Sequence, residues 1–480
     1  MKLSKLLERI NIPLCGEDVE ITNITNDSRK VTEGSLFVSI NGRKQVDYGR
    51  YIEEALEKGA VAVVTQEIRE TTADIMQYKT DRILEAYSEM SAAFFNDPAK
   101  EMKLIGVTGT NGKTSTAYFV KHILEYAGYK TGLIGTVEVL AGDEAIGSTL
   151  TTPEPFELHG IFAHMRDKGI EYVIMECSSQ ALDQKRLYGL EYAVTGFTNL
   201  TQDHLDYHGN FRSYADAKAI VFKQSQKAVI NIDDGEAEMM IRAMEDRPVL
   251  HYSPGGEKAD MICRDVVYQA HMSEFVIEYM GKTHNVTVTT PGKFAVSNAM
   301  CAVGMAVEAG IEIETACRGM SEAKAVKGRA EICYRDDNIT VIIDYAHTPD
   351  AVMNILKAVK TEGKKTVLFG CGGDRDSTKR PLMATMAARY ADKLIITSDN
   401  PRSEDPMSII EDILLGLHTV EKPYITIPDR REAIEYALTN AEKGETVFLL
   451  GKGHEDYQIL STGKIHFDER EIVREILNIK

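Results

Sequence analysis

The sequence lacks closely spaced cysteines and long apolar runs. Its seven cysteines are scattered and form no CxxC pair, and an odd, dispersed set is typical of reduced, mostly buried thiols in a cytoplasmic protein. No apolar stretch approaches the ~18 residues that a membrane helix needs. The N-terminal segment MKLSKLLERINIPLCGEDVEI predicts an amphipathic helix start with charges inside it, not a signal peptide. We therefore expect a cytoplasmic protein without a membrane partner.

Basic residues are also scarce, since 55 Lys and Arg stand against 73 Asp and Glu and give a formal net charge of −18. A nucleic-acid-binding protein normally presents a basic face, so this balance argues against such a partner. It does not exclude an anionic small molecule, because a local loop can bind phosphate inside an acidic protein. Hydrophobic residues at 43% are ordinary for a globular protein, and 480 residues correspond to about three domains of ~150 residues.

Strand and helix patterns divide the chain into three α/β domains, at 1–98, 99–327 and 328–480. The first is small and ends at Asn96-Asp97-Pro98, where proline favours a boundary. In the second, strands alternate with helices, which predicts a mostly parallel sheet covered by helices; the glycine loop described next makes a P-loop ATPase-like domain the expectation. A small antiparallel insertion is expected from about 261 to 288. The third predicts a Rossmann-like domain whose strands end in polar loops, where α/β sheets bind ligands.

The segment GVTGTNGKTST, residues 106–116, follows a predicted strand and opens a predicted helix. Glycines let backbone N–H groups converge on phosphate oxygens, and the helix N-terminus adds a favourable dipole. Lys113 can reach the β- and γ-phosphates, and Thr114 can ligate Mg²⁺. The alternative is a glycine-rich turn without a ligand. The expected ATP-binding residues of the loop are Gly109, Thr110, Asn111, Gly112, Lys113, Thr114 and Ser115.

Acidic residues follow two later strands. Glu176 ends the predicted strand YVIMEC, and a carboxylate beside an ATP loop is a natural ligand for Mg²⁺, which usually takes one or two carboxylates. An ordinary solvated acid is the alternative. The segment NLTQDHLDYHG packs Asp203, His204, Asp206 and His208 into six residues, which would also suit zinc. The neighbouring nucleotide loop favours magnesium.

GVTGTNGKTST resembles the ATP loop of the Mur ligase family, which includes folylpolyglutamate synthetase, and the resemblance covers nearly the whole chain. It implies an amide ligase in which ATP phosphorylates a carboxylate and an amine attacks the acyl phosphate, with two Mg²⁺ ions offsetting the negative charge. It also implies that Lys218 is carbamylated, as N6-carboxylysine. The implied residues are Lys113, Lys218, Glu176 and His204 for catalysis; Thr114, Glu176, His204 and carbamylated Lys218 for metal; and Asn298, Arg329 and Asp344 for ATP.

NDSRKVTEGSLFVSINGR, residues 26–43, resembles the uridine-diphosphate segment of the family members that form the UDP-muramyl-tripeptide. From the residues alone, an N-terminal turn is an equal alternative; the resemblance assigns Ser28 to UDP. Gln180 stands where relatives often have histidine, and residues 42–47 depart from the family's loop and carry no assignment. The positions that match the binding residues of the UDP-MurNAc-dipeptide are Thr151, Thr152, Ser178, Gln184 and Arg186.

Three strand-end loops of the third domain have the residues of a zwitterion site. Guanidinium groups bind carboxylates in bidentate fashion, and acids bind an ammonium. Two arginines with acids suit an amino acid whose distal end is itself zwitterionic, and in this family DNPR implies a diaminopimelate-adding enzyme, because lysine has no distal carboxylate. The set is Arg375 in GCGGDRDSTKRP, Asp399, Asn400, Pro401 and Arg402 in DNPR, and Gly451 and Glu455 in GKGHEDYQ.

The resemblance therefore implies a bacterial cytoplasmic ligase that adds meso-diaminopimelate to the D-glutamate carboxylate of UDP-N-acetylmuramoyl-L-alanyl-D-glutamate. ATP would be the co-substrate and Mg²⁺ the cofactor, and the enzyme would act as a monomer in peptidoglycan synthesis, and so in cell shape and division. Lysine or another diamino acid is the nearest alternative substrate. A folylpolyglutamate synthetase would have no use for the uridine segment, and a P-loop regulatory protein without ligase chemistry would not need the third domain's site.

Overall fold

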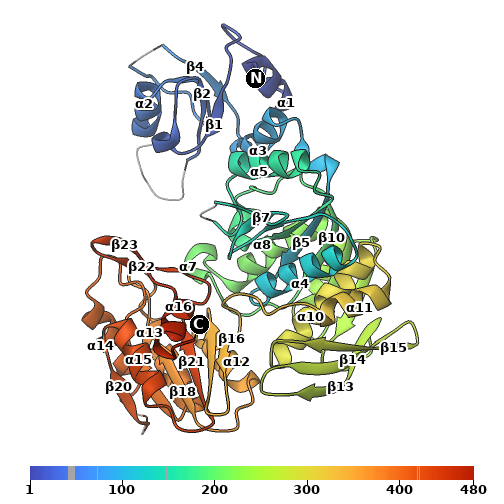
Figure 1. Cartoon of the computed structure of the whole chain (residues 1–480). Helices are drawn as coiled ribbons and strands as arrows, with labels where there is room; N and C mark the ends of the chain where they lie inside the picture. The colour runs from blue at the N-terminus through green and yellow to red at the C-terminus, as the bar shows by residue number, and fades with distance from the viewer. Residues whose placement is uncertain (42–48, 73, 148–149, 419, 421, 480) are drawn as a thin grey trace. The chain divides into compact units, whose positions relative to one another are not determined.

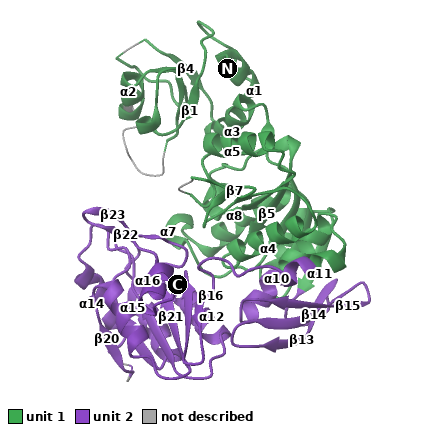
Figure 2. Cartoon of the chain, viewed as in Figure 1, with its two compact units in different colours: residues 1–252, 301–316 green, residues 253–300, 317–480 purple. Residues whose placement is uncertain are grey.

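The computed structural model of the chain (Figure 1) describes residues 1–41, 49–72, 74–147, 150–418, 420 and 422–479. The unassigned segment 42–47 therefore lies outside the described residues. Two compact units make up the chain, one of residues 1–252 and 301–316 and one of residues 253–300 and 317–480 (Figure 2). The boundaries predicted at 98 and 327 stay predictions. In the part of the chain that the structure describes, no helix is long and apolar enough to cross a membrane.

The N-terminal part of the first unit is a small parallel sheet with helices on both faces (Figure 1). Its elements are α1 (Leu3–Arg9), β1 (Asn23–Thr25), η1 (Ser28–Lys30), β2 (Ser35–Ser39), α2 (Gly49–Glu57), β3 (Ala60–Thr65), β4 (Met76–Lys79), α3 (Ile83–Phe94) and η2 (Pro98–Glu101). The strands lie in the order β1-β2-β3-β4. Because side chains alternate along a strand, Leu36 and Val38 pack with α1 and α3, whereas Phe37 packs with α2.

The rest of the first unit is built on a mostly parallel sheet, as predicted. Its elements are β5 (Lys103–Thr108), α4 (Lys113–Tyr126), β6 (Thr131–Ile134), β7 (Val139–Ala141), β8 (Glu144–Ile146), α5 (Pro155–Asp167), β9 (Tyr172–Glu176), α6 (Ser179–Asp183), β10 (Tyr192–Phe197), α7 (Leu205–His208), α8 (Phe211–Lys223), β11 (Ser225–Asn231), α9 (Ala237–Met244) and β12 (Val249–Ser253). The order is β12-β11-β10-β5-β9-β6-β7-β8, with β7 and β8 antiparallel. Since β5 lies between β10 and β9, the loops that follow these three strands meet at one edge.

The second unit begins with the predicted antiparallel insertion. Strands β13 (Met261–Tyr268), β14 (Ser273–Tyr279) and β15 (Lys282–Val288) pair antiparallel in sequence order, which confirms the expectation for residues 261–288. Helices α10 (Lys293–Glu308) and α11 (Ile313–Ser321) follow, and each contains residues of both units.

A second α/β sheet forms the C-terminal part of this unit. Its elements are β16 (Glu331–Arg335), β17 (Ile339–Asp344), α12 (Pro349–Ala358), β18 (Lys365–Phe369), α13 (Lys379–Tyr390), β19 (Lys393–Ile396), α14 (Pro406–Leu415), β20 (Tyr424–Thr426), α15 (Arg430–Thr439), β21 (Glu445–Leu450), β22 (Tyr457–Leu460), β23 (Gly463–His466) and α16 (Glu469–Ile476). The order is β16-β17-β21-β18-β19-β20, parallel except for β16. Val367 and Phe369 pack with α12, α13 and α14, and Leu368 packs with α15 and α16.

A histidine on α5 makes the first unit sensitive to acid. His159 is buried, and neither of its ring nitrogens has a hydrogen-bond partner among the described residues. Burial lowers the pKa of His159 to about 4, although the charge of Asp97 acts in the opposite direction. Between its ordinary pKa of 6.5 and about 4, the unfolded chain therefore binds a proton that the native chain does not. Stability falls as the pH drops through this window.

Replacing His159 by leucine should remove this sensitivity. Between pH 8 and pH 5, we expect the free energy of unfolding of the unmodified chain to fall by about 2 kcal/mol more than that of His159→Leu. Chemical denaturation at the two pH values measures the difference. His164→Leu, which removes a half-exposed histidine from the same helix, is the control. The same pH dependence in His159→Leu and the unmodified chain would contradict the prediction.

Candidate active site

A tight loop joins β5 to α4 where the sequence predicts a phosphate loop. Gly109 has a φ of 151° and Gly112 a φ of 88°, which side chains other than glycine rarely allow. A Cβ at Gly109 would lie only 2.0 Å from Oγ1 of Thr198. Helix α4 then begins at once with Lys113. The strand–loop–helix geometry is therefore as expected, and glycine at Gly109 is required by the close approach of the chain after β10.

The residues that follow β10 hold this loop, although no sequence motif marks them. The backbone N–H of Thr110 donates to the carbonyl oxygen of Asn199 at 2.8 Å, and the N–H of Asn111 donates to its Oδ1 at 3.0 Å. Oγ1 of Thr198 donates to the carbonyl oxygen of Asn111 at 2.6 Å. These contacts fix the conformation of the loop before any ligand binds.

Two lysines converge on one carbonyl oxygen of the loop. Nζ of Lys113 donates to the carbonyl oxygens of Gly109 at 2.9 Å and Thr110 at 2.8 Å, and Nζ of Lys218 donates to Gly109 at 2.7 Å. Lys218 is 1% exposed, and its Nζ lies 4.7 Å from the ring centroid of Tyr214. Burial, and then the charge of Lys113, lower the pKa of Lys218 well below its usual range. A larger share of this amine is thus neutral and nucleophilic than in an exposed lysine.

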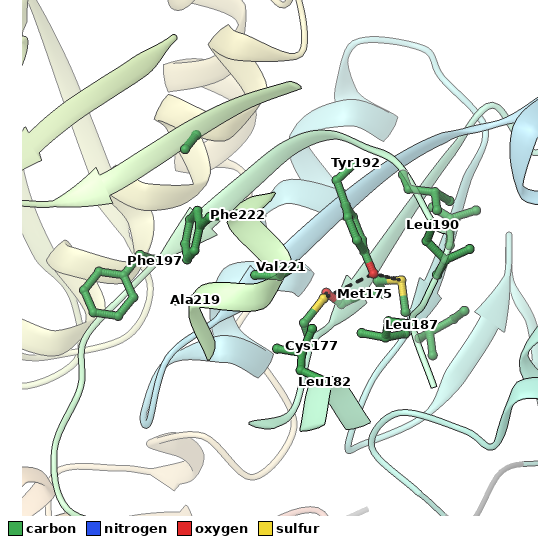
Figure 3. Close-up of a cluster of buried hydrophobic side chains, with 14 of the residues drawn as sticks. Met175, Cys177, Leu182, Leu187, Leu190, Tyr192, Phe197, Ala219, Val221 and Phe222 are labelled. Atoms are coloured by element: carbon green, nitrogen blue, oxygen red, sulfur yellow. Dashed lines mark hydrogen bonds between the residues drawn. The ribbon is translucent and has the colours of Figure 1, made fainter. Parts of the chain in front are cut away.

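Glu176 ends β9 and is buried on the face of the sheet opposite to Met175 and Cys177. On the core side, the hydroxyl of Tyr192 contacts the sulfur atoms of both Met175 and Cys177 (Figure 3), and alternation directs Glu176 to the other face. Its Oε1 accepts from the N–H of Thr136 at 2.8 Å, and its Oε2 from the Oγ1 of the same residue at 3.1 Å. Each oxygen keeps a further lone pair, so the buried carboxylate can also accept a metal ion.

His204 precedes α7 in a left-handed conformation, with a φ of 52°. Burial lowers the pKa of His204, and Lys113 and Lys218 lower it further against the opposing charge of Asp203. A neutral imidazole is the form that binds metals. His208 instead contacts Oγ of Ser179 at 3.0 Å. Among the described residues, no three His, Cys, Asp or Glu side chains are grouped to hold a metal ion, so the zinc alternative has no ligand cluster there.

The residues assigned to the UDP-dipeptide form one connected group beyond β9. They are Thr151, Thr152, Ser178, Gln184 and Arg186. The hydroxyl oxygens of Thr152 and Ser178 lie 3.1 Å apart, and Nη1 of Arg186 donates to the carbonyl oxygen of Thr152 at 2.9 Å. Nη2 of Arg186 donates to Oε1 of Gln184. The hydroxyl of Thr151 lies 3.1 Å from that of Thr136, which donates to Glu176. The carbonyl oxygen of Glu176 accepts from Oγ1 of Thr152 at 2.8 Å. The structure therefore brings together residues that are up to 35 positions apart.

Ser28 lies apart from this group, in the N-terminal part of the unit. It is buried, and its Oγ donates to Oε2 of Glu54 at 2.9 Å. A residue without a sequence motif, Glu154, links the two regions. It accepts from Nδ2 of Asn26 at 3.4 Å and pairs with Nη2 of Arg186 at 2.9 Å.

The other residues assigned to ATP belong to the second unit. Asn298 is buried on α10. Asp344 ends β17, where it accepts from the N–H groups of Ala330 at 2.6 Å and Ala346 at 2.8 Å. Burial raises the pKa of Asp344, and the charge of Arg329 opposes this shift. Arg329 and Asp344 therefore lie close to each other at one strand end.

Asp399, Asn400, Pro401 and Arg402, here called the selector turn, follow β19 as predicted. Nη1 of Arg402 donates to the carbonyl oxygen of Gly373 at 2.7 Å. A Cβ at Gly372 would lie 2.8 Å from the same Nη1, and one at Gly373 would lie 2.0 Å from the carbonyl oxygen of Pro401. The glycines after β18 thus allow the selector turn to pack against them.

Two further strand-end loops reach the selector turn. Nδ2 of Asn400 donates to Oε2 of Glu455 at 2.9 Å. Gly451 follows β21 with a φ of 109°, and a Cβ there would lie 3.1 Å from Oδ2 of Asp399. Arg375 is exposed and donates to the carbonyl oxygen of Asp374 at 3.2 Å. The loops after β18, β19 and β21 therefore combine acids, an amide and a guanidinium at one edge of the sheet.

The chain is similar to known proteins along its whole length. Three family models match the chain: Mur ligase middle domain at 107–306, Mur ligase glutamate ligase domain at 328–453, and Mur ligase family catalytic domain at 20–111. UDP-N-acetylmuramoyl-L-alanyl-D-glutamate--2,6-diaminopimelate ligase 1 of Clostridium acetobutylicum is 42% identical over 99% of both chains. The 2,6-diaminopimelate ligase of Caldanaerobacter subterraneus subsp. tengcongensis is also 42% identical, over 99% of both chains.

A solved structure supports the same assignment. A UDP-N-acetylmuramoyl-L-alanyl-D-glutamate--2,6-diaminopimelate ligase superposes with a TM-score of 0.70 and 30% identity, over 100% of this chain and 99% of that one. Sequence and fold therefore agree along the whole length, which confirms the three-domain α/β class. The chain belongs to the Mur ligase family.

Proposed function

We propose that this chain is an ATP-dependent carboxylate–amine ligase that adds meso-diaminopimelate to the D-glutamate carboxylate of UDP-N-acetylmuramoyl-L-alanyl-D-glutamate, in peptidoglycan precursor synthesis. The likeness to diaminopimelate ligases along the whole chain carries this proposal. Residues 1–98 would bind the uridine end, 99–327 ATP, and 328–480 the amino acid.

The residues at the strand ends have distinct tasks in this reaction. Loop N–H groups and the start of α4 would bind the phosphates, and Lys113 would leave the loop carbonyls for the γ-phosphate. Arg186 and Thr152 would orient the dipeptide. Its carboxylate oxygen attacks the γ-phosphorus as the bond to ADP breaks. The amine then attacks the acyl carbon, phosphate leaves, and an amide forms.

Magnesium fits the residues beside the loop. Glu176, His204 and Thr114 would hold one ion, and Lys218, as its carbamate, would help to hold a second. Mg²⁺ needs few protein ligands and keeps water and phosphate oxygens around it, which suits one buried carboxylate and one neutral imidazole. Bound Mg²⁺ would offset the charge of the phosphates.

The buried amine of Lys218 supports its proposed modification. A neutral amine attacks the carbon of CO₂ and releases a proton, which leaves a carbamate anion in place of a cation. Burial favours the neutral amine needed for this step. The product would add two carboxylate oxygens next to the phosphate loop.

The direct test uses purified protein with ATP, Mg²⁺ and the UDP-dipeptide, and measures phosphate release with each candidate amino acid. We expect meso-diaminopimelate to stimulate release and to appear in the product by mass spectrometry. A strong preference for lysine would favour the alternative substrate. Phosphate release without any dependence on the UDP-dipeptide would instead indicate a P-loop protein without ligase chemistry.

Arg402 should select the distal carboxylate of the amino acid. Arg402→Ala should raise the KM for diaminopimelate by about 10²-fold, because a buried bidentate contact to a carboxylate contributes roughly 2–4 kcal/mol. Arg402→Lys should also have a raised KM for diaminopimelate, since lysine lacks the planar guanidinium that binds a carboxylate with two hydrogen bonds. Steady-state kinetics for all three substrates provide the measurement, with exposed Arg474→Ala as the control. Equal effects on all three KM values would mean that Arg402 is structural.

We also propose that the enzyme is a monomer in the bacterial cytoplasm and needs no nucleic-acid or membrane partner. Light scattering of the purified chain at assay concentration tests the oligomeric state, and a mass of twice 53.4 kDa would contradict it.

A further inference from the structure

A buried lysine lies beneath the selector turn and carries no assigned role. Lys452 follows β21 and is 0% exposed. Its Nζ lies 3.0 Å from Oε2 of Glu455, 3.3 Å from Oδ1 of Asn400 and 3.5 Å from Oδ1 of Asp399. An ammonium has three N–H donors, and these three acceptors all belong to the proposed amine site.

The contacts of Lys452 determine how the amide of Asn400 is turned. Oδ1 of Asn400 accepts from Lys452 and from the N–H of Ile459 at 2.9 Å, so its Nδ2 is directed to Glu455. The carbonyl oxygen of Ile459 in turn accepts from the backbone N–H of Arg402 at 3.0 Å. The ammonium thus lies at the centre of a network that ends at the selector arginine.

Both residues next to Lys452 are glycines in backbone conformations that other residues rarely adopt. Gly451 and Gly453 have φ values of 109° and 56°. A Cβ at Gly453 would lie 2.6 Å from Cβ of Tyr345, and one at Gly451 would crowd Asp399. The chain therefore carries the ammonium to a fixed place between two acids, where an apolar side chain of similar length would deprive both carboxylates of the cation that contacts them.

We propose that Lys452 is a positioning and specificity-determining residue of the amine site, an inference that rests on the proposed function. Apart from Arg375, which is exposed to solvent, the site has two cations, Lys452 and Arg402, and two anions, Asp399 and Glu455. Lys452 contacts both anions. The distal end of diaminopimelate has both an ammonium and a carboxylate, so its binding adds no net charge to these two cations and two anions. Without Lys452, the charges of Arg402, Asp399 and Glu455 sum to a negative value. A substrate whose distal end has only an ammonium, as in lysine, then gains affinity relative to diaminopimelate, whose distal end is zwitterionic.

The test compares Lys452→Met with Lys452→Arg in the complete ligase reaction. For Lys452→Met, we expect the KM for diaminopimelate to rise about 30-fold, with KM values for ATP and the UDP-dipeptide within about 2-fold. Its kcat/KM ratio for diaminopimelate over lysine should fall about 10-fold. Lys452→Arg keeps the charge and should keep that ratio. Lys443→Met, at an exposed lysine before β21, is the matched control.

The outcomes separate this inference from the proposed function. Absence of diaminopimelate-dependent phosphate release in the unmodified protein contradicts the function itself. An active unmodified protein, with all three KM values raised equally in Lys452→Met or with an unchanged preference over lysine, overturns the inference alone. If Lys452→Met does not fold, the double variant Lys452→Met/Glu455→Gln, in which Asp399 is the one carboxylate that loses its contact with Lys452, is compared with Glu455→Gln. A further rise of about 5-fold in the KM for diaminopimelate supports the inference, and no further rise overturns it.

Discussion

Replacing Lys113 by methionine should lower kcat for the ligase reaction by about 10³-fold and leave the fold intact. Lys113 is the first residue of α4, and its Nζ donates to the loop carbonyls of Gly109 and Thr110. Methionine keeps a stem of similar length and removes the charge. The loss should fall on kcat because the charge is needed most while the phosphoryl group is transferred.

A second effect of Lys113 adds to this loss. After burial, the charge of Lys113 is the largest cause that lowers the pKa of Lys218. Lys113→Met should therefore raise that pKa and leave less neutral amine to capture CO₂. One substitution then weakens both the phosphate contact and the proposed carbamate, so the effect should exceed that of a single lost hydrogen bond.

Phosphate-release kinetics at saturating ATP measure the change in kcat, and circular dichroism verifies the fold. Lys223→Met, at an exposed lysine of the helix that carries Lys218, controls for the loss of a lysine and should behave as the unmodified protein. A kcat for Lys113→Met within about 10-fold of the unmodified value, with only the KM for ATP raised, would assign Lys113 to ground-state binding instead.

Patterns that span a few residues were enough to predict the contiguous parts of the site. The strand, glycine loop and helix from 103 to 126 are recognisable because each element has its own periodicity and the loop needs glycine. The selector turn was predicted because polar residues follow a buried strand at once. The antiparallel insertion at 261–288 was predicted from the alternation of its side chains. In each case, the physical cause lies within one stretch of sequence.

Residues that act through distant partners could not be predicted in this way. Asn199 holds Asn111 across 88 residues, Glu154 reaches Asn26 across 128, and Lys452 reaches Asn400 across 52. These pairs form only when the chain folds. Asn199 and Asn111 follow the adjacent strands β10 and β5, whereas the other two pairs join elements that are not neighbours in a sheet. The hairpin of β22 and β23 was also missed, because β23 is exposed along its whole length and has no buried face to give a pattern.

A buried arginine fixes the strand ends that carry the selector turn. Arg430, the first residue of α15, donates from Nε to Oε1 of Glu469 at 2.8 Å. Its other two nitrogens donate to the carbonyl oxygens of Ser398 at 3.2 Å and Leu450 at 2.9 Å. Both side chains of the ion pair are 0% exposed. Since Ser398 and Leu450 precede Asp399 and Gly451, one guanidinium holds the ends of β19 and β21 together.

Arg430→Met should lower the free energy of unfolding by about 3–5 kcal/mol, because it leaves the carboxylate of Glu469 buried without its partner. The double variant Arg430→Met/Glu469→Leu should recover the part of the lost free energy of unfolding that is due to the unpaired carboxylate of Glu469. It should remain about 1–3 kcal/mol less stable than the unmodified chain, because the two carbonyl groups lose their donor. Arg431→Met breaks the neighbouring exposed pair with Glu475 and should cost at most about 1 kcal/mol.

Urea denaturation of the three variants separates these contributions, and kinetics of the double variant connect them to the site. If Arg430 positions the strand ends, the double variant should have a raised KM for diaminopimelate and an almost unchanged KM for the UDP-dipeptide, whose proposed binding residues belong to the other unit. Equal losses of stability in Arg430→Met and Arg431→Met would contradict the assignment, since burial is the main physical difference between the two ion pairs.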